Sequence, residues 1–169
     1  MRQRGGDLVA EFSRPYPIPV ICKHLGIDDD AHDQFGRWAD IIFSGLDADA
    51  DAVLGRLEQI TAAQGELDEY ATGLVAERKG CPHADLVSDL VQATYEEDRL
   101  SVDELVAMIE AILLAGTDTT RNQLGSLLAV LAGQPDQYQA VRNDRSLVPA
   151  VVEESLRYIG AVRTTARGA

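Results

Sequence analysis

Positive charge is scarce in this sequence, which carries 15 lysines and arginines against 28 aspartates and glutamates and has a formal net charge of −13. Binding to a phosphate backbone needs a basic face, and the few cations here are scattered along the chain. A nucleic-acid partner is therefore excluded. The acidic surface favours solubility but does not by itself indicate a function.

Cysteine and long apolar runs are scarce as well. The two cysteines, Cys22 and Cys81, form no Cys-x-x-Cys pair, and nothing ahead of them resembles a secretory leader. These features predict a reduced, cytoplasmic setting. No apolar run reaches the roughly 18 residues that a membrane span needs, so no membrane contact is expected. No metal site is predicted either, because ligand spacing is missing around His24, His32 and His83.

Strict apolar–polar alternation is also missing, whereas apolar residues recur at helical spacing almost everywhere. The fold class is therefore predicted to be all-α, with little or no β structure. After Tyr158 the residues become strand-like and no helix cap precedes them. Helices are expected over 21–26, 30–45, 52–79, 85–95, 101–132, from Pro135 onwards and over 147–158.

The segment 52–79 keeps a seven-residue apolar rhythm, which is typical of an amphipathic helix. A coiled coil would show the same rhythm, but Gln64 and Gly65 interrupt the seam. A helix that packs into a globular core is therefore the preferred interpretation.

Acidic residues precede this helix with the spacing of a calcium-binding EF-hand loop. Asp47, Asp49, Asp51 and Glu58 fall at positions 1, 3, 5 and 12 of such a loop. Ala52, however, stands where that loop needs a glycine for its sharp turn. An acidic cap at the amino end of the helix is the simpler interpretation.

The segment 101–132 opens with Ser101 and Glu104, the residues of a capping box. A helix of this extent would be about 45–50 Å long at a rise of about 1.5 Å per residue, enough to span a whole domain. The sequence therefore predicts one long central helix.

Polar residues interrupt this apolar helix in the sequence LLAGTDTTRN. In one interpretation Gly116 ends a helix, and Thr117 or Asp118 caps the next one. In a second, the helix is continuous and Asp118 pairs with Arg121, which would contribute only a few tenths of a kcal/mol.

A third interpretation of the same residues is chemical. Gly116 would let a ligand approach the helix backbone closely, because it has no side chain. The Thr119 hydroxyl could bond the Ala115 carbonyl or loosen the helix there, and Asp118 adds a titratable group. Together these residues would form a helix wall that binds a small polar molecule and supplies it with protons.

The run from Ala115 to Thr120 resembles the oxygen-binding motif of cytochrome P450 enzymes, which have Ala or Gly, then Gly, any residue, an acid, Thr, and Thr or Ser. A second signature lies about 35 residues downstream, where Glu154 and Arg157 match the Glu-x-x-Arg of that family. The likeness covers nearly the whole chain, including the turn GQPDQ. The resemblance implies that 1–169 is a partial P450 domain, a truncated helical core.

By this resemblance, Ala115 and Gly116 would line the distal side of a haem, where dioxygen binds. Thr119 would hydrogen-bond the oxygen, and Asp118 would relay protons to it through water. Protonation of this kind needs an ordered donor within roughly 3 Å and a controlled supply of protons.

The resemblance also implies a structural ion pair between Glu154 and Arg157, buried beneath the haem, and a haem propionate contact for Arg163. It implies a small organic substrate and a ferredoxin-type electron donor. The family's Phe-x-x-Gly-x-x-x-Cys-x-Gly loop, which provides the cysteine ligand of the iron, is missing from the sequence. The amino-terminal region of the family is missing too, so the chain is expected to be inactive alone.

Three functions remain open: a segment of a haem-thiolate monooxygenase, a haem-free helper that stabilises a partner enzyme such as a glycosyltransferase, and an inert remnant. A core without its usual neighbours would expose apolar side chains, so self-association or a partner protein is expected. The residues expected to be exposed are Ile109, Ile112, Leu113, Leu127 and Leu128.

Overall fold

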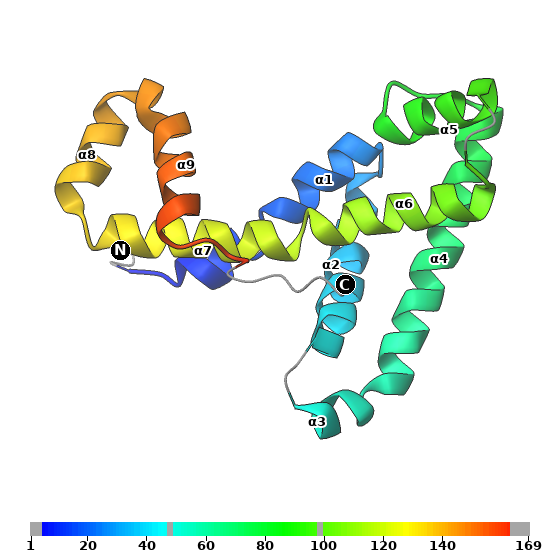
Figure 1. Ribbon diagram of the computed structural model, residues 1–169, viewed down its shortest axis with the longest axis horizontal. Helices are drawn as coiled ribbons and strands as arrows, with labels where there is room; N and C mark the ends of the chain where they lie inside the picture. Colours follow the sequence, from blue (N-terminus) through cyan, green and yellow to red (C-terminus); the bar gives the residue numbers. More distant parts are fainter. Residues whose placement is uncertain (1–4, 47–48, 98–99, 163–169) are drawn as a thin grey trace, which may run out of the picture. The chain divides into compact units, whose positions relative to one another are not determined.

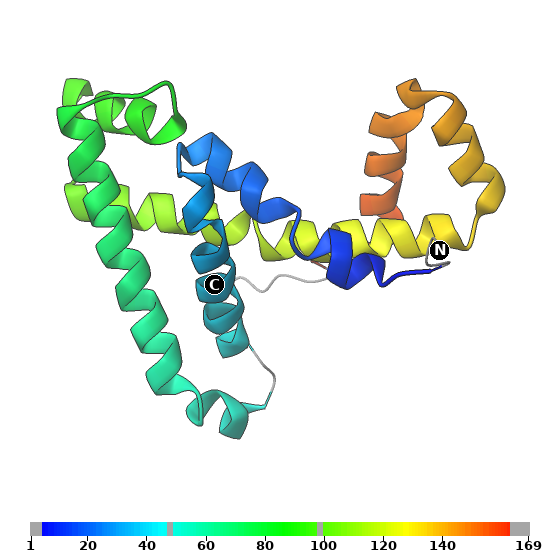
Figure 2. The same ribbon diagram turned by 180° about the vertical axis from the view of Figure 1, so that it is seen from behind.

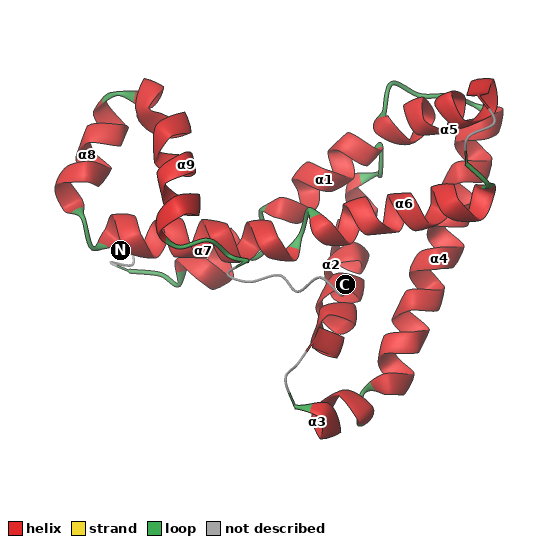
Figure 3. Ribbon diagram, viewed as in Figure 1, coloured by secondary structure: helices red, strands yellow, loops and turns green. Residues whose placement is uncertain are grey.

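The computed structural model describes residues 5–46, 49–97 and 100–162, and within these ranges it contains helices and no strand (Figure 3). The all-α prediction is confirmed. The chain divides into two compact units, one formed by Ile18–Asp118 and the other by Met1–Pro17 together with Thr119–Ala169. Among the helices described, none is long and apolar enough to cross a membrane.

The unit Ile18–Asp118 is built around two crossing helices, α4 and α6, with α2 and α5 packed against α4 (Figures 1 and 2). A short 3-10 turn, preceded by Asp28 and containing Asp30, leads into α2. The elements are α1 (Pro17–Leu25), η2 (Asp29–Ala31), α2 (His32–Phe43), η3 (Ser44–Leu46), α3 (Ala50–Leu54), α4 (Leu57–Gly80), α5 (Leu86–Glu97) and α6 (Val102–Ala115).

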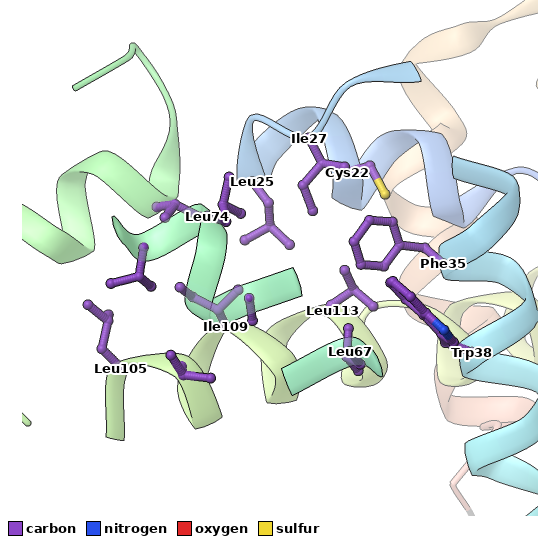
Figure 4. Packing of buried hydrophobic residues seen from close by; sticks show 14 of the residues in the cluster. Cys22, Leu25, Ile27, Phe35, Trp38, Leu67, Leu74, Leu105, Ile109 and Leu113 are labelled. Atoms are coloured by element: carbon purple, nitrogen blue, oxygen red, sulfur yellow. The ribbon is translucent and has the colours of Figure 1, made fainter. Parts of the chain in front are cut away.

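The core of this unit lies where α1, α2, α4, α5 and α6 meet, and Figure 4 shows its side chains pointing toward one another. Phe35 packs edge-on against Trp38 and Tyr70, with ring centroids 5.0 and 4.9 Å away. The Trp38 indole N–H donates to Oε2 of Glu66 at 2.7 Å, so this large buried ring keeps a polar partner.

Two residues of α6 that were expected to be exposed lie in this core. Ile109 and Leu113 are 2% and 1% exposed, so the expectation is wrong for both. The reason is that α4 packs across α6 and covers its apolar face within the same unit. Ile112, Leu127 and Leu128 are half-buried.

The expected helix over 52–79 is two helices, α3 and α4, separated by a turn at Gly55 and Arg56. The Asp49 carboxylate accepts hydrogen bonds from the backbone of Asp51 and Ala52, so it caps α3. Asp47 lies outside the described residues. Among the residues described, no group of three or more His, Cys, Asp or Glu could hold a metal ion. The capping interpretation therefore holds for Asp49, on the short helix rather than the long one.

A buried ion pair joins the carboxyl end of α4 to the start of α5. The Arg78 Nε donates to Oδ2 of Asp85 at 2.7 Å, and both side chains are only 4% exposed. Arg78 Nη2 donates to the Gly26 carbonyl at 2.7 Å, and Nη1 pairs with Glu77. The Asp85 carboxylate also accepts the backbone N–H of Ser88 at 2.7 Å. One guanidinium thus ties α1, α4 and α5 together.

Gly26 ends α1, as predicted, and its backbone has a φ of +72°. A Cβ atom there would lie 2.0 Å from Oδ2 of Asp85. The glycine is therefore required for its conformation and for the close approach of the ion pair.

Glu110 on α6 faces α4, and its pKa is raised by burial and by the neighbouring Asp68. Gln64 Nε2 donates to its Oε2 at 3.2 Å, while Oε1 is buried without a hydrogen-bond partner. An acid whose native pKa is raised stabilises the fold below its unfolded pKa, and this contribution is lost as pH rises through the native value.

Replacement of Glu110 with glutamine should therefore raise the free energy of unfolding at pH 7, by less than about 1 kcal/mol. The difference between Glu110→Gln and the parent should shrink toward pH 4, where the parent carboxyl is also protonated. Urea denaturation at both pH values measures it. Asp103→Asn, on the exposed amino end of α6, is the matched control. A gain that grows toward low pH would contradict this assignment.

The other unit contains η1 (Val9–Ser13), α7 (Asp118–Ala132), α8 (Pro135–Asn143), η4 (Arg145–Leu147) and α9 (Val148–Tyr158), with α8 and α9 joined through η4 (Figure 1). Pro135 stands in the first turn of α8, as predicted. Apart from Pro17, none of the apolar side chains described in this unit is buried. Among the large ones, those more than half exposed are Leu8, Val9, Tyr16, Tyr138, Tyr158 and Val162.

Candidate functional site

The expected helix over 101–132 is present as α6 and α7, with Gly116 and Thr117 between them. Its start is as predicted: the Ser101 Oγ accepts the Glu104 N–H at 3.2 Å, and Oε2 of Glu104 accepts the Ser101 N–H at 2.8 Å. At the interruption the Thr117 N–H donates to the Leu114 carbonyl at 3.1 Å, three residues back rather than four. The helix is therefore locally tightened within the candidate motif.

Thr117 turns into the core at this point. Its side chain is fully buried, and its hydroxyl donates to the Leu113 carbonyl at 2.7 Å. This is the type of bond that the sequence suggested for Thr119 and Ala115. It satisfies a buried polar group, and such bonds to the fourth preceding carbonyl tend to bend helices.

Gly116 lies against α1. A Cβ atom on Gly116 would lie 3.1 Å from Cδ1 of Ile21 and 3.1 Å from the Ile112 carbonyl oxygen. The side of the helix left open by the missing side chain is thus filled by Ile21. Gly116 therefore lets α6 and α1 pack closely together. It does not leave space for a ligand on the side that faces Ile21.

The remaining residues of the motif are more accessible. Ala115, the last residue of α6, is exposed, Asp118 is half-buried, and Thr119 in the first turn of α7 is exposed. Along the sequence, a small residue thus precedes the buried Thr117, and a carboxylate and a hydroxyl follow it. This group can donate hydrogen bonds through the hydroxyl and hold or release a proton at the carboxylate.

Glu154 and Arg157 form the expected ion pair on α9. Arg157 Nε and Nη2 donate to Oε2 and Oε1 of Glu154 at 2.7 and 2.6 Å, which is a two-pronged guanidinium–carboxylate contact. The hydrogen bond from Arg157 holds the pKa of Glu154 below its usual range. The two side chains are 60% and 69% exposed, whereas the resemblance implies a buried network. Arg163 lies outside the described residues.

Neither cysteine of the chain fits the role of a haem iron ligand. Cys22 is fully buried in the core, and burial raises the pKa of its thiol to about 12, so it stays protonated. Cys81 is exposed directly after the carboxyl end of α4, and its sequence KGCPHA lacks the glycine-rich context of the family's iron ligand. The described part of the chain therefore offers no thiolate ligand suited to a haem iron.

The buried role of Thr117 could have been found in the sequence. Leu105, Ile109 and Leu113 recur every four residues on the buried face of α6, and Thr117 is the next member of that series. Its polarity suggested a cap instead. Gln123 makes a second polar contact that no sequence pattern indicates, because its partners lie 32 and 38 residues away along the chain.

Comparison with known proteins adds independent information. The profile of the Cytochrome P450 family matches residues 48–168. Cytochrome P450 107B1 of Saccharopolyspora erythraea is 40% identical over 152 residues, which are 90% of this chain and 35% of the relative. The 6-deoxyerythronolide B hydroxylase of the same organism is 39% identical over 95% of this chain and 38% of its own length. The chain thus spans well under half of these relatives.

Solved structures show the same similarity. The putative thioether synthase SgvP, involved in the tailoring step of griseoviridin, superposes with a TM-score of 0.78 at 35% identity, over 94% of this chain and 39% of that one. CYP109E1 from Bacillus megaterium, solved in complex with testosterone, gives a TM-score of 0.76 at 29% identity, over 90% of this chain and 40% of that one. The sequence motifs, the helical fold and the family profile agree: this chain belongs to the cytochrome P450 family.

Proposed function

We propose that this chain forms the distal wall of a haem-thiolate monooxygenase that hydroxylates a small organic substrate. The observation that carries the proposal is the tightened turn at Gly116 and Thr117. The buried Thr117 fixes this turn to the core, while Ala115 and Thr119 on either side of it remain accessible. Complete members of the family bind a haem, which supplies the oxygen chemistry.

In this proposal Thr119 and Asp118 are the catalytic residues. The Thr119 hydroxyl donates a hydrogen bond to the reacting molecule, and the Asp118 carboxylate holds and passes on a proton. Ala115 leaves room beside the backbone, and Gly116 keeps α6 close to Ile21 so that the wall does not shift.

The two ion-pair residues have a structural role in the proposal. Glu154 and Arg157 present a preformed two-pronged contact on α9. Their exposure leaves the outer edges of both side chains available for further hydrogen bonds. Arg163 is proposed to contact a propionate of the cofactor, in line with the sequence resemblance.

The proposed partners follow from the relatives. One relative is named for the hydroxylation of 6-deoxyerythronolide B, and one solved structure holds testosterone. A small organic substrate is therefore proposed. A ferredoxin-type electron donor is proposed as well, in line with the sequence resemblance. The 169-residue chain, with many apolar side chains exposed in its second unit, is also proposed to self-associate or to bind a partner protein.

A chimera tests the proposal, because a relative can supply the segments that this chain does not contain. The aligned part of 6-deoxyerythronolide B hydroxylase is replaced by this chain, so that the rest of the enzyme comes from the relative. We expect the chimera to fold, to take up haem and to show the ferrous carbonyl absorbance of a thiolate-ligated haem. A folded chimera that takes up no haem would contradict the proposal and favour the haem-free helper.

A further inference from the structure

Gln123 on α7 makes two hydrogen bonds to segments that lie far from it in the sequence. Its Nε2 donates to the Ser155 hydroxyl on α9 at 3.0 Å. Its Oε1 accepts the backbone N–H of Ala161, beyond the end of α9, at 2.9 Å. All three residues belong to the same compact unit.

The chemistry of the partners fixes the orientation of this amide. A backbone N–H can only donate, so Ala161 must face the Gln123 oxygen and leave the nitrogen for Ser155. The Ser155 hydroxyl donates its own proton to the Val152 carbonyl at 2.8 Å and can therefore accept from Gln123. Ser155 is only 6% exposed, so water has little access to its hydroxyl. The Gln123 amide takes the place of water as the donor to this buried oxygen.

The segment that Gln123 contacts follows directly after α9. α9 ends at Tyr158, and the Ile159 N–H closes its last turn on the Ser155 carbonyl at 2.9 Å. The chain then bends at Gly160, where a Cβ atom would lie 3.1 Å from the Leu156 carbonyl oxygen. The bond from Ala161 to Gln123 comes directly after this bend.

We infer that Gln123 is a positioning residue, which fixes the backbone at Ala161 and thereby the point from which the chain continues to Arg163. The importance of this role rests on the proposed function, in which Arg163 contacts the cofactor. Gln123 lies four residues after Thr119 on α7, one helical turn further along the same face. One helix would thus carry the catalytic hydroxyl and hold the segment that leads to the cofactor-binding arginine.

The test is amide hydrogen exchange at Ala161 in the 169-residue chain, measured residue by residue by NMR. Gln123→Met keeps the length and volume of the side chain but removes both hydrogen bonds. We expect exchange at Ala161 to become about tenfold faster, since one net hydrogen bond is lost, while amides of α6 such as Ile109 stay unchanged.

Gln123→Glu is the conservative rescue, because a carboxylate still accepts from Ala161. We expect it to restore slow exchange at Ala161. Unchanged exchange in Gln123→Met would overturn the inference, as would exchange in Gln123→Glu as fast as in Gln123→Met. This test requires neither haem nor turnover. A negative result would therefore not affect the proposed function, and a failed chimera would not affect the inference about Gln123.

Discussion

Replacement of Arg78 with methionine is expected to cost about 3–5 kcal/mol of the free energy of unfolding. The change removes the guanidinium but leaves the Asp85 carboxylate, 4% exposed, as a buried charge without its partner. It also removes the donor to the Gly26 carbonyl. A small domain is stable by only about 5–15 kcal/mol, so the loss should be large in urea denaturation followed by circular dichroism.

The exposed pair on α9 provides a matched control. Arg157→Met also removes a guanidinium contact to a carboxylate, but both partners there face water. We expect it to leave the unfolding transition nearly unchanged, because solvent replaces the lost contact. Similar losses in Arg78→Met and Arg157→Met would show that burial of the ion pair does not matter.

The pH dependence of the parent follows from the same pair. Burial by itself would raise the pKa of Asp85, but the backbone N–H of Ser88 and the Arg78 guanidinium outweigh it and lower the pKa. A carboxyl with a lowered native pKa stabilises the fold above its unfolded pKa of about 3.9, and this contribution is lost as pH falls through the native value.

Gly26→Ala is the second change with a large expected effect, more than about 3 kcal/mol of unfolding free energy. The alanine would have to adopt a φ of +72°, and its Cβ would lie 2.0 Å from the Asp85 carboxylate. Asp85 must then move away from Arg78. The substitution therefore both strains the backbone at residue 26 and weakens the ion pair. Gly73→Ala in α4 is the control: its Cβ meets nothing within 4 Å, and alanine should stabilise the helix by about 1 kcal/mol.

A double-mutant cycle separates these two contributions. Asp85→Gly removes the three atoms nearest to the new methyl group of Gly26→Ala, which are Oδ2, Cγ and Cβ of Asp85. The loss in the double variant should therefore be smaller than the sum by more than about 1 kcal/mol. Strict additivity would mean that the backbone conformation, and not the clash, accounts for the effect of Gly26→Ala.

Local sequence signals predicted the parts of this fold that depend on neighbouring residues. The capping box at Ser101, the end of α1 at Gly26 and the first turn of α8 at Pro135 are all present. In each case the residue type satisfies a backbone requirement within a few residues of itself. Such requirements are visible without knowledge of the tertiary structure.

Features that depend on packing between helices were predicted less well. Arg78 follows Leu67, Ala71 and Leu74 on the buried face of α4. Its position in the sequence does not reveal that Asp85 is the carboxylate with which it pairs. The buried state of Ile109 and Leu113 depends on α4 crossing α6, which the sequence pattern does not specify. For the candidate site, the sequence predicts the motif 115–120 as a unit. The inward turn of Thr117 and the contact of Gly116 with Ile21 depend on how the helices pack, which the sequence pattern does not specify.

The most direct measurement of the central claim compares Thr119→Ala with Thr120→Ala in the chimera with 6-deoxyerythronolide B hydroxylase. The quantity measured is product formed per electron pair consumed. If Thr119 directs proton delivery at the distal wall, its alanine variant should lose at least about tenfold in this ratio, while the neighbouring Thr120→Ala stays close to the parent. Equal ratios in the two variants would contradict the account.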